Sequence, residues 1–430
     1  YYEFVAKVSK IRNGDDYMEI KRDYYLQKLI DRKNNNLIKV ITGIRRCGKS
    51  YLLNHLFRNY LLDSGVSENH IISIALDDDD NSDLLDPKKL RQYINEKISD
   101  NDLYYILLDE IQLVSNFEGL LNGLLRKENL DIYVTGSNSR FLSSDIITEF
   151  RGRGDEIRVY PLSFKEFYSN YDGSKEDAWV EYYTYGGLPL VMNYKKEEDK
   201  MQYLDSQKQN VYLNDVIERN HIQNKEDLEK LIEIISSSIG SLTNPLKLSK
   251  TFRSYDKNTL LTDKTIYNYL SYFEDAFIIE KALRYDIKGK KYIDTPYKYY
   301  FTDIGIRNAF LNFRQQEENH IMENIIYIEL RRRGFKVDVG VVEVRNKEGR
   351  KQYEIDFIAN KGNNKYYIQS ALNIDTKEKR EQEEKSFMNV NDFFKKVIIV
   401  KDNIKRWRDD KGIVIMGITD FLLDEDSLNY

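Results

Sequence analysis

The chain has 430 residues, a length that predicts about three domains of roughly 150 residues each. Hydrophobic residues make up 41% and charged residues 32%, which excludes an intrinsically disordered chain and predicts a globular protein. With 66 Lys and Arg against 71 Asp and Glu, the net charge of −5 excludes a uniformly polybasic nucleic-acid binder but allows a local basic face.

Cysteine and histidine are scarce in the chain. Cys47 is the one cysteine, which excludes intramolecular disulfides and Cys-rich zinc sites and fits a reducing compartment. No apolar run approaches the ~18 residues of a membrane span, and residues 1–10 lack the apolar core of a signal peptide. We therefore expect a cytoplasmic protein without a membrane partner. Met18 opens a stretch that leads into an amphipathic helix, so residues 1–17 are interpreted as an N-terminal extension.

Short β-rich apolar runs alternate with helical stretches in the first part of the chain. This order is typical of βαβ units and predicts an α/β fold with a parallel sheet covered by helices on both faces. The predicted strands are Leu37–Thr42, Ile71–Leu76, Tyr104–Leu108, Ile132–Thr135 and Glu156–Val159.

The rest of the chain changes pattern three times. Residues 161–236 are mostly helical and are predicted to form a lid. Residues 237–312 contain short helices followed by a hairpin of Phe277–Leu283 and Lys291–Phe301, which is the order of a winged helix. Residues 313–430 begin with a helix over Glu317–Arg333 and continue with strands, so they are predicted to form a separate small α/β or α+β domain.

A phosphate-binding loop follows the first predicted strand and opens a helix, so that residues 18–160 are predicted to be a P-loop core. The pattern G-x-x-x-x-G-K-[ST] is matched at every fixed position, and with the next residue the candidate nucleotide-binding set is Gly43, Ile44, Arg45, Arg46, Cys47, Gly48, Lys49, Ser50 and Tyr51. Glycines let backbone N–H groups wrap the phosphates of ATP, and the lysine reaches the outer phosphates. The serine hydroxyl is predicted to ligate Mg²⁺.

Two carboxylates end the strand Tyr104–Leu108. Asp109 is predicted to hold Mg²⁺, and Glu110 is predicted to polarise the attacking water, so that hydrolysis depends on Glu110. Solvated carboxylates at a strand end are the alternative interpretation.

Two further polar groups are candidates for catalysis. Asn138 follows the strand Ile132–Thr135 and could orient the water, although a polar turn explains it equally well. Arg153 could bind the γ-phosphate of its own chain or of a neighbouring subunit in an oligomer, because arginine binds phosphates bidentately. A solvated or ion-paired arginine is the alternative.

These residues resemble a family of bacterial and archaeal AAA-type ATPases that carry a C-terminal domain of unknown function. Besides the phosphate loop, the likeness rests on the motifs Asp109–Gln112, Thr135–Ser139, Arg151–Arg153, Tyr160–Phe164, Gly186–Pro189, Tyr300–Gly305 and Glu354–Phe357. The resemblance implies an ATPase core of the additional-strand type, then a winged helix, then a domain similar to PD-(D/E)xK nucleases.

A nuclease of that type needs a helix Glu, a strand Asp and a Glu-x-Lys triplet that together hold Mg²⁺ and stabilise the transition state. Glu323 or Glu329 would supply the helix acid, and Asp356 would supply the strand acid. Gln369 can replace the Glu as a ligand, but Ala371 cannot replace the Lys, so the pattern argues against nuclease activity.

The predicted winged helix could contact duplex DNA or a protein. Its second helix follows Thr262 as N-cap, and the candidate groups for phosphate and groove contacts are Lys264, Thr265, Tyr267, Asn268, Lys288, Lys290 and Lys291. We therefore expect a Mg²⁺-dependent ATPase, with Lys49, Glu110, Asn138 and Arg153 in catalysis, that couples nucleotide state to the later domains. A nucleotide-gated scaffold without significant hydrolysis and an ATP-regulated nuclease are the alternatives.

Overall fold

The computed structural model describes residues 10–13, 16–136, 150, 152–255, 261–314, 317–346 and 349–429. The described residues divide into two compact units, taken in turn below. Unit 1 comprises residues up to 162 together with 188–195 and 275–277, and unit 2 comprises residues 163–187, 196–274 and those from 278 onward. The first division lies close to residue 160, where the sequence predicts the end of the P-loop core.

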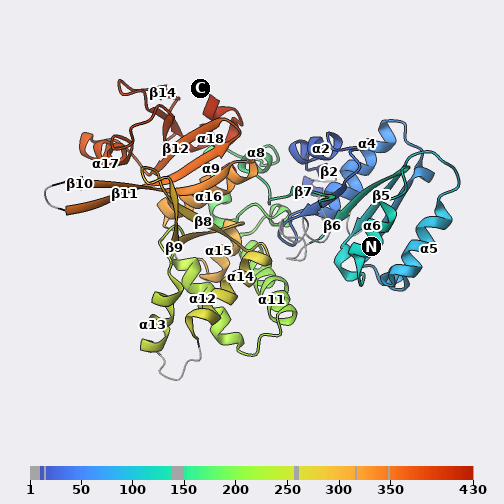
Figure 1. Cartoon of the computed structure of the whole chain (residues 1–430). Coiled ribbons are helices and arrows are strands. Elements are labelled where there is room, and N and C mark those ends of the chain that lie inside the picture. The colour runs from blue at the N-terminus through green and yellow to red at the C-terminus, as the bar shows by residue number, and fades with distance from the viewer. Residues whose placement is uncertain are drawn as a thin grey trace. The chain divides into compact units, whose positions relative to one another are not determined.

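Unit 1 is built on a five-stranded parallel sheet with the order β4-β5-β6-β3-β7 (Figure 1). Its strands are β3 (Ile38–Thr42), β4 (Ile71–Ala75), β5 (Tyr104–Asp109), β6 (Leu130–Thr135) and β7 (Gly154–Arg158). Each predicted strand overlaps one of them, so the predicted parallel sheet is confirmed. Every residue of β3, β5 and β6 is buried, because helices cover both faces of the sheet.

Helices cover the two faces of this sheet in pairs. On one face, α5 (Pro87–Lys97) and α6 (Phe117–Leu124) bury leucines and isoleucines in a core shared with all strands except β7. On the other face lies a continuous helix of α3 (Lys49–Tyr51), the π-helical η1 (Leu52–Phe57) and α4 (Arg58–Asp63), preceded in the chain by α2 (Asp23–Ile30). The shorter helical turns are η2 (Glu68–His70), η3 (Asp79–Leu85), η4 (Ile111–Leu113) and η6 (Pro189–Asn193).

The predicted N-terminal extension contains ordered backbone. Strand β1 (Lys10–Asn13) pairs antiparallel with β2 (Asp16–Glu19), so the predicted boundary at residue 17 falls within β2. Among the described residues, no helix has both the length and the apolar character needed to cross a bilayer.

Unit 2 begins with helices and ends with a mixed sheet. The helices are α8 (Phe164–Tyr168), α9 (Lys175–Tyr185), α10 (Glu197–Ser206), η7 (Gln207–Leu213), α11 (Asn214–Arg219), α12 (Lys225–Ser237), α13 (Pro245–Tyr255), α14 (Asp263–Asp275), α15 (Ile304–Phe310), α16 (Glu318–Arg332), α17 (Lys377–Phe387), α18 (Ile418–Leu423) and η8 (Ser427–Asn429). The strands are β8 (Ile279–Asp286), β9 (Lys291–Phe301), β10 (Lys336–Asn346), β11 (Gly349–Lys361), β12 (Asn364–Ala371), β13 (Lys395–Val400), β14 (Trp407–Arg408) and β15 (Val414–Gly417).

The hairpin predicted as the wing is present, as β8 and β9, but it belongs to a larger sheet. The eight strands have the order β14-β15-β13-β12-β11-β10-β8-β9, in which β8 pairs parallel with β10. The predicted boundary at residues 312 and 313 therefore does not separate the hairpin from the C-terminal strands. The further division of residues 161–430 into lid, winged helix and nuclease-like domain stays a prediction.

Candidate functional site

The predicted phosphate loop lies at the carboxyl end of β3 and leads into α3. Gly43 has a φ of 144°, and a Cβ there would lie 2.1 Å from the carbonyl oxygen of Val159, so no larger residue fits. Gly48, with a φ of 97°, turns the chain into the helix that starts at Lys49. The loop thus has the tight backbone path and the helix N-terminus that bind phosphates.

Lys49 is buried within the loop. Its Nζ donates hydrogen bonds to the carbonyl oxygens of Gly43 at 3.0 Å and Ile44 at 3.2 Å, and its side chain is almost fully enclosed. Arg45 and Arg46 of the same loop are exposed. The loop therefore holds one ammonium inside its own turn and presents two guanidinium groups outward.

Arg22 is a buried residue that contacts this loop, and the sequence analysis missed it. Its guanidinium donates to the carbonyl oxygen of Cys47 at 3.0 Å and to that of Tyr160 at 2.6 Å, and it lies 4.7 Å from the ring centroid of Tyr25. Cys47 is fully buried, and Tyr51 stacks on His55 with ring centroids 4.8 Å apart. Arg22 thus ties the segment before α2 to the phosphate loop.

Asp109 ends β5 close to Ser50. Its carboxylate accepts hydrogen bonds from the hydroxyl of Thr135 and from the Asn54 amide at 3.3 Å, and the Ser50 hydroxyl also bonds to it. Burial and then the charge of Glu110 raise the pKa of Asp109 to about 7. Ser50 and Asp109 therefore place a hydroxyl and a carboxylate side by side. Oxygen ligands of this kind suit a hard divalent cation such as Mg²⁺.

Glu110 follows with a left-handed backbone, at a φ of 55°. Its N–H donates to the Thr135 hydroxyl at 3.0 Å, and its carboxylate accepts a hydrogen bond from the Gln112 amide. Thr135 at the end of β6 therefore contacts both acidic residues. The sequence analysis placed Thr135 and Gln112 in motifs but gave neither a role in the site. Asn138 lies outside the described residues.

Arg153 does not lie with the phosphate loop of its own chain. It is exposed and immediately precedes β7, where its carbonyl oxygen accepts a hydrogen bond from the N–H of Ile38 at 2.8 Å. Ile38 begins β3, whereas the loop follows the end of β3, so the length of the strand, about 16 Å, separates the two places. This placement does not support the predicted contact with the γ-phosphate of the same chain, which stays untested. A contact with a neighbouring subunit stays a prediction.

A second predicted site lies in unit 2. Glu323 on α16, Asp356 on β11 and Gln369 on β12 are brought together. The N–H of Asp356 donates to Gln369 at 3.4 Å, and after burial the charge of Glu323 raises the pKa of Asp356. The cation among them is Lys298 of β9, whose Nζ lies 3.0 Å from Glu323 and 2.7 Å from Glu354. Sequence reasoning missed this lysine.

The residues of this second site do not fit a metal ion in the structure. Glu323 already accepts bonds from Lys298 and, at 2.6 Å, from the hydroxyl of Tyr300. Burial and the Glu323 charge raise the pKa of Asp356 well above its usual range, while the charge of Lys298 lowers it. Glu329, the other predicted helix acid, is held by Arg332 and Arg333.

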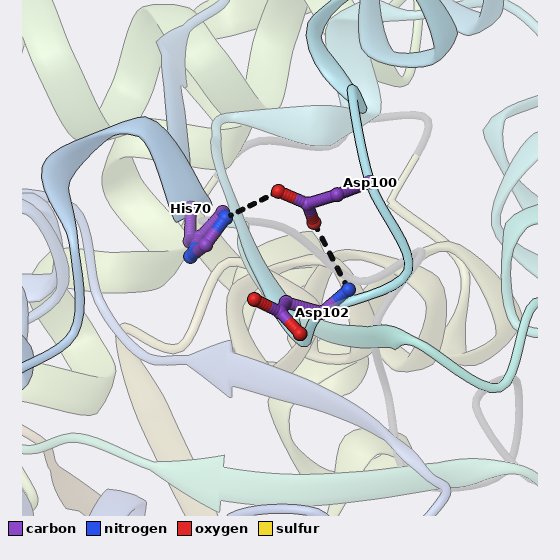
Figure 2. A group of neighbouring side chains, drawn as sticks. All are labelled: His70, Asp100 and Asp102. Atoms are coloured by element: carbon purple, nitrogen blue, oxygen red, sulfur yellow. Dashed lines mark hydrogen bonds and ion pairs between the residues drawn. The ribbon is translucent and has the colours of Figure 1, made fainter.

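Within the described part of the chain, one group of His and acidic residues brings its ligand atoms within 4.8 Å of one another: His70, Asp100 and Asp102 (Figure 2). Nε2 of His70 lies 3.1 Å from Asp100, and the N–H of Asp102 donates to the same carboxylate at 2.9 Å. The group lies where β4 and β5 begin, at the opposite edge of the sheet from Asp109, and is therefore separate from the nucleotide site.

The comparisons with known proteins agree with the site geometry. Residues 35–168 match a family described as AAA domain, and residues 176–317 match a domain of unknown function, DUF8612. Among solved structures, a Walker-type ATPase of Pyrococcus abyssi has a TM-score of 0.48 at 17% identity, covering 70% of this chain and 98% of its own. The ORC1 protein of Aeropyrum pernix in complex with DNA has a TM-score of 0.31 at 11% identity, covering 71% and 94%. Both are too distant to bear on function.

Two relatives are similar over most of their length. An uncharacterized protein of Haemophilus influenzae is 35% identical over 94% of this chain and 98% of its own. An uncharacterized protein of Methanocaldococcus jannaschii is 30% identical over 88% of this chain and 81% of its own. The chain therefore belongs to the family of bacterial and archaeal AAA-domain proteins that includes these two relatives.

Proposed function

We propose that this protein is a Mg²⁺-dependent ATPase. The observation that carries the proposal is the meeting of Ser50 and Asp109 beside a phosphate loop that encloses Lys49. Lys49 and the loop N–H groups bind the phosphates, and Ser50 and Asp109 hold Mg²⁺, which neutralises charge on the phosphate oxygens. A binding loop alone would not require a buried carboxylate at this point.

Glu110 takes the proton of the attacking water in this proposal. Gln112 and Thr135 hold its side chain and backbone, so that the carboxylate keeps one orientation while Asp109 beside it serves the metal. Asn138 is proposed to orient the same water. The ATP that such an enzyme consumes is supplied in the cytoplasm, which is the proposed location.

Arg153 is proposed to act on ATP bound by a neighbouring subunit. Arg153 is exposed at the edge of the sheet opposite the phosphate loop of its own chain. A guanidinium at this edge can complete the nucleotide site of a second chain without any rearrangement of the site in its own chain. The proposal requires an oligomer of at least two chains.

Nucleic acid is the proposed partner of unit 2. The turn between β8 and β9 presents Lys288, Lys290 and Lys291 to solvent, and α14 begins with the N–H of Thr265 bonded to Thr262 as predicted. Nuclease activity is not proposed, because Ala371 stands where the nuclease pattern has its lysine.

The decisive experiment is ATP turnover by the wild type, Lys49→Ala and Glu110→Gln, each with and without duplex DNA. We expect Lys49→Ala to lose binding and turnover, and Glu110→Gln to keep binding and lose turnover. If Glu110→Gln hydrolyses ATP at an active wild type's rate, Glu110 is not the base. If the wild type binds ATP without hydrolysing it, the protein is instead a nucleotide-gated scaffold.

A further inference from the structure

Two neighbouring phenylalanines are exposed in the loop between α17 and β13. Phe393 is fully exposed and Phe394 is 43% exposed. Removing each ring from water would contribute about 25 cal/mol of stabilisation per Å² of apolar surface buried. Two adjacent exposed rings therefore favour a ligand with an apolar face at this place.

A lysine lies over the ring of Phe394 within unit 2. Nζ of Lys365 on β12 lies 4.8 Å from the ring centroid of Phe394 and 4.9 Å from that of Tyr367. Ile287, which follows β8 and begins the β8–β9 turn, and Tyr367 of β12 belong to one hydrophobic core cluster, so the turn packs close to β12. Burial lowers the pKa of Lys365, the charge of Asp392 raises it, and the charge of Lys290 in this turn lowers it. The exposed Lys288 and Lys291 of the same turn add to the positive charge.

Three acidic groups of this region accept internal hydrogen bonds. Asp392 accepts the hydroxyl of Tyr367 at 2.6 Å, and Asp286 accepts the N–H of Gly289 at 2.9 Å. Asp338 accepts the hydroxyl of Tyr292. The exposed groups include the three lysines of the turn and the two phenylalanine rings, and also the carboxylate of Asp294 on β9.

We propose that Lys288, Lys290, Lys291, Lys365, Phe393 and Phe394 form a binding surface for single-stranded nucleic acid. The lysines contact phosphates, and Phe393 and Phe394 stack with bases. In a duplex the bases already stack on one another, so an exposed ring gains a base as a partner only where the strand is single. Two rings are few for insertion into a lipid surface, which commonly uses a long amphipathic helix.

This inference rests on the nucleic-acid part of the proposed function and deepens it, since it names the strand state and a surface other than α14. It does not depend on hydrolysis. Lys49→Ala is therefore expected to bind single strands as the wild type does, which separates a failure of this inference from a failure of the proposed ATPase.

The test measures fluorescence anisotropy of a fluorescein-labelled oligo(dT) of about 20 nucleotides, and of a duplex of the same length, at about 50 mM salt. Phe393→Ala is expected to weaken oligo(dT) binding by about 5-fold to 100-fold, while Phe393→Trp keeps it. Reversing two turn lysines, Lys288→Glu with Lys290→Glu, is expected to weaken binding and to reduce the log–log salt slope by about 1.4.

A matched control changes the same residue type elsewhere in unit 2. Lys230→Glu on α12 alters an exposed side chain away from this surface and is expected to leave oligo(dT) binding unchanged. Because Phe393 is fully exposed, its variants are expected to melt at the wild-type temperature.

Three results would overturn the inference. The first is that the wild-type protein does not bind oligo(dT). The second is that Phe393→Ala binds oligo(dT) as the wild type does. The third is that the protein binds only the duplex and that Tyr267→Ala loses this binding. The first of these would direct the search for the ligand of this surface to proteins.

Discussion

Thr135 joins the two acidic residues of the proposed ATPase, and replacing it with valine tests whether their position controls turnover. Its hydroxyl donates to Asp109 and accepts from the N–H of Glu110. Thr135→Val keeps the shape of the fully buried side chain and removes both hydrogen bonds.

The expected loss in the free energy of unfolding follows from the two hydrogen bonds that Thr135→Val removes. A hydrogen bond to a buried carboxylate contributes about 1.5–3 kcal/mol and a bond to a neutral group about 1 kcal/mol, so unit 1 is expected to lose about 3 kcal/mol. That loss lowers the melting temperature by roughly 6–12 °C for a domain of this size. Turnover is expected to fall by about 10-fold to 100-fold, because Asp109 and Glu110 lose their common anchor.

Thermal unfolding without nucleotide and phosphate release with ATP measure the two effects. Thr135→Ser retains the hydroxyl and is the control, with turnover expected within about 2-fold of the wild type. If Thr135→Val melts early but hydrolyses ATP at the wild-type rate, the residue only stabilises the fold and the reasoning about Glu110 fails.

Three further outcomes are expected. Gly43→Ala should abolish binding of a fluorescent ATP analogue, because its Cβ meets a carbonyl oxygen at 2.1 Å. Gly65→Ala has a similar strain from a φ of 87° but meets nothing within 4 Å, so it should bind normally; normal binding by both would contradict the backbone argument. Arg153→Ala by itself should not turn over ATP, but a mixture with Lys49→Ala should regain part of the turnover. In a mixed oligomer, one subunit then supplies Lys49 and its neighbour supplies Arg153 to the same site. Turnover of Arg153→Ala by itself at the wild-type rate would exclude the proposed subunit contact. Glu329→Gln should destabilise the protein by about 3 kcal/mol at pH 7 in denaturant titrations. Burial by itself would raise the pKa of Glu329, but Arg332 and Arg333 lower it below the ordinary value of 4.5. The stabilisation is therefore fully present above pH 4.5 and is lost as the pH falls through the lowered pKa of the folded state. An equal gap between variant and wild type at pH 3 and pH 7 would contradict this pairing.

The strands and the phosphate loop of unit 1 could be predicted because their signals are local. A strand buried on both faces is a continuous apolar run, and Gly43 and Gly48 stand where the backbone excludes other residues. Arg22 and Lys298 could not be predicted in the same way. Arg22 reaches Tyr160 across 138 positions, and Lys298 meets Glu354 because β8 pairs with β10, a pairing that no local pattern encodes.

The motifs that support the family resemblance have different physical roles. Gly186 and Gly187 end α9 against Asp303, whose carboxylate accepts the N–H of Gly187 at 2.8 Å and that of Ile306 at 3.0 Å. A Cβ on Gly305 would lie 2.0 Å from the carbonyl oxygen of Tyr185, so this contact also requires glycine. These motifs pack α9 against α15 within unit 2, far along the chain from the phosphate loop. A motif in this family therefore indicates chemistry only where its side chains converge on a ligand site, as those of Lys49, Ser50 and Asp109 are proposed to do.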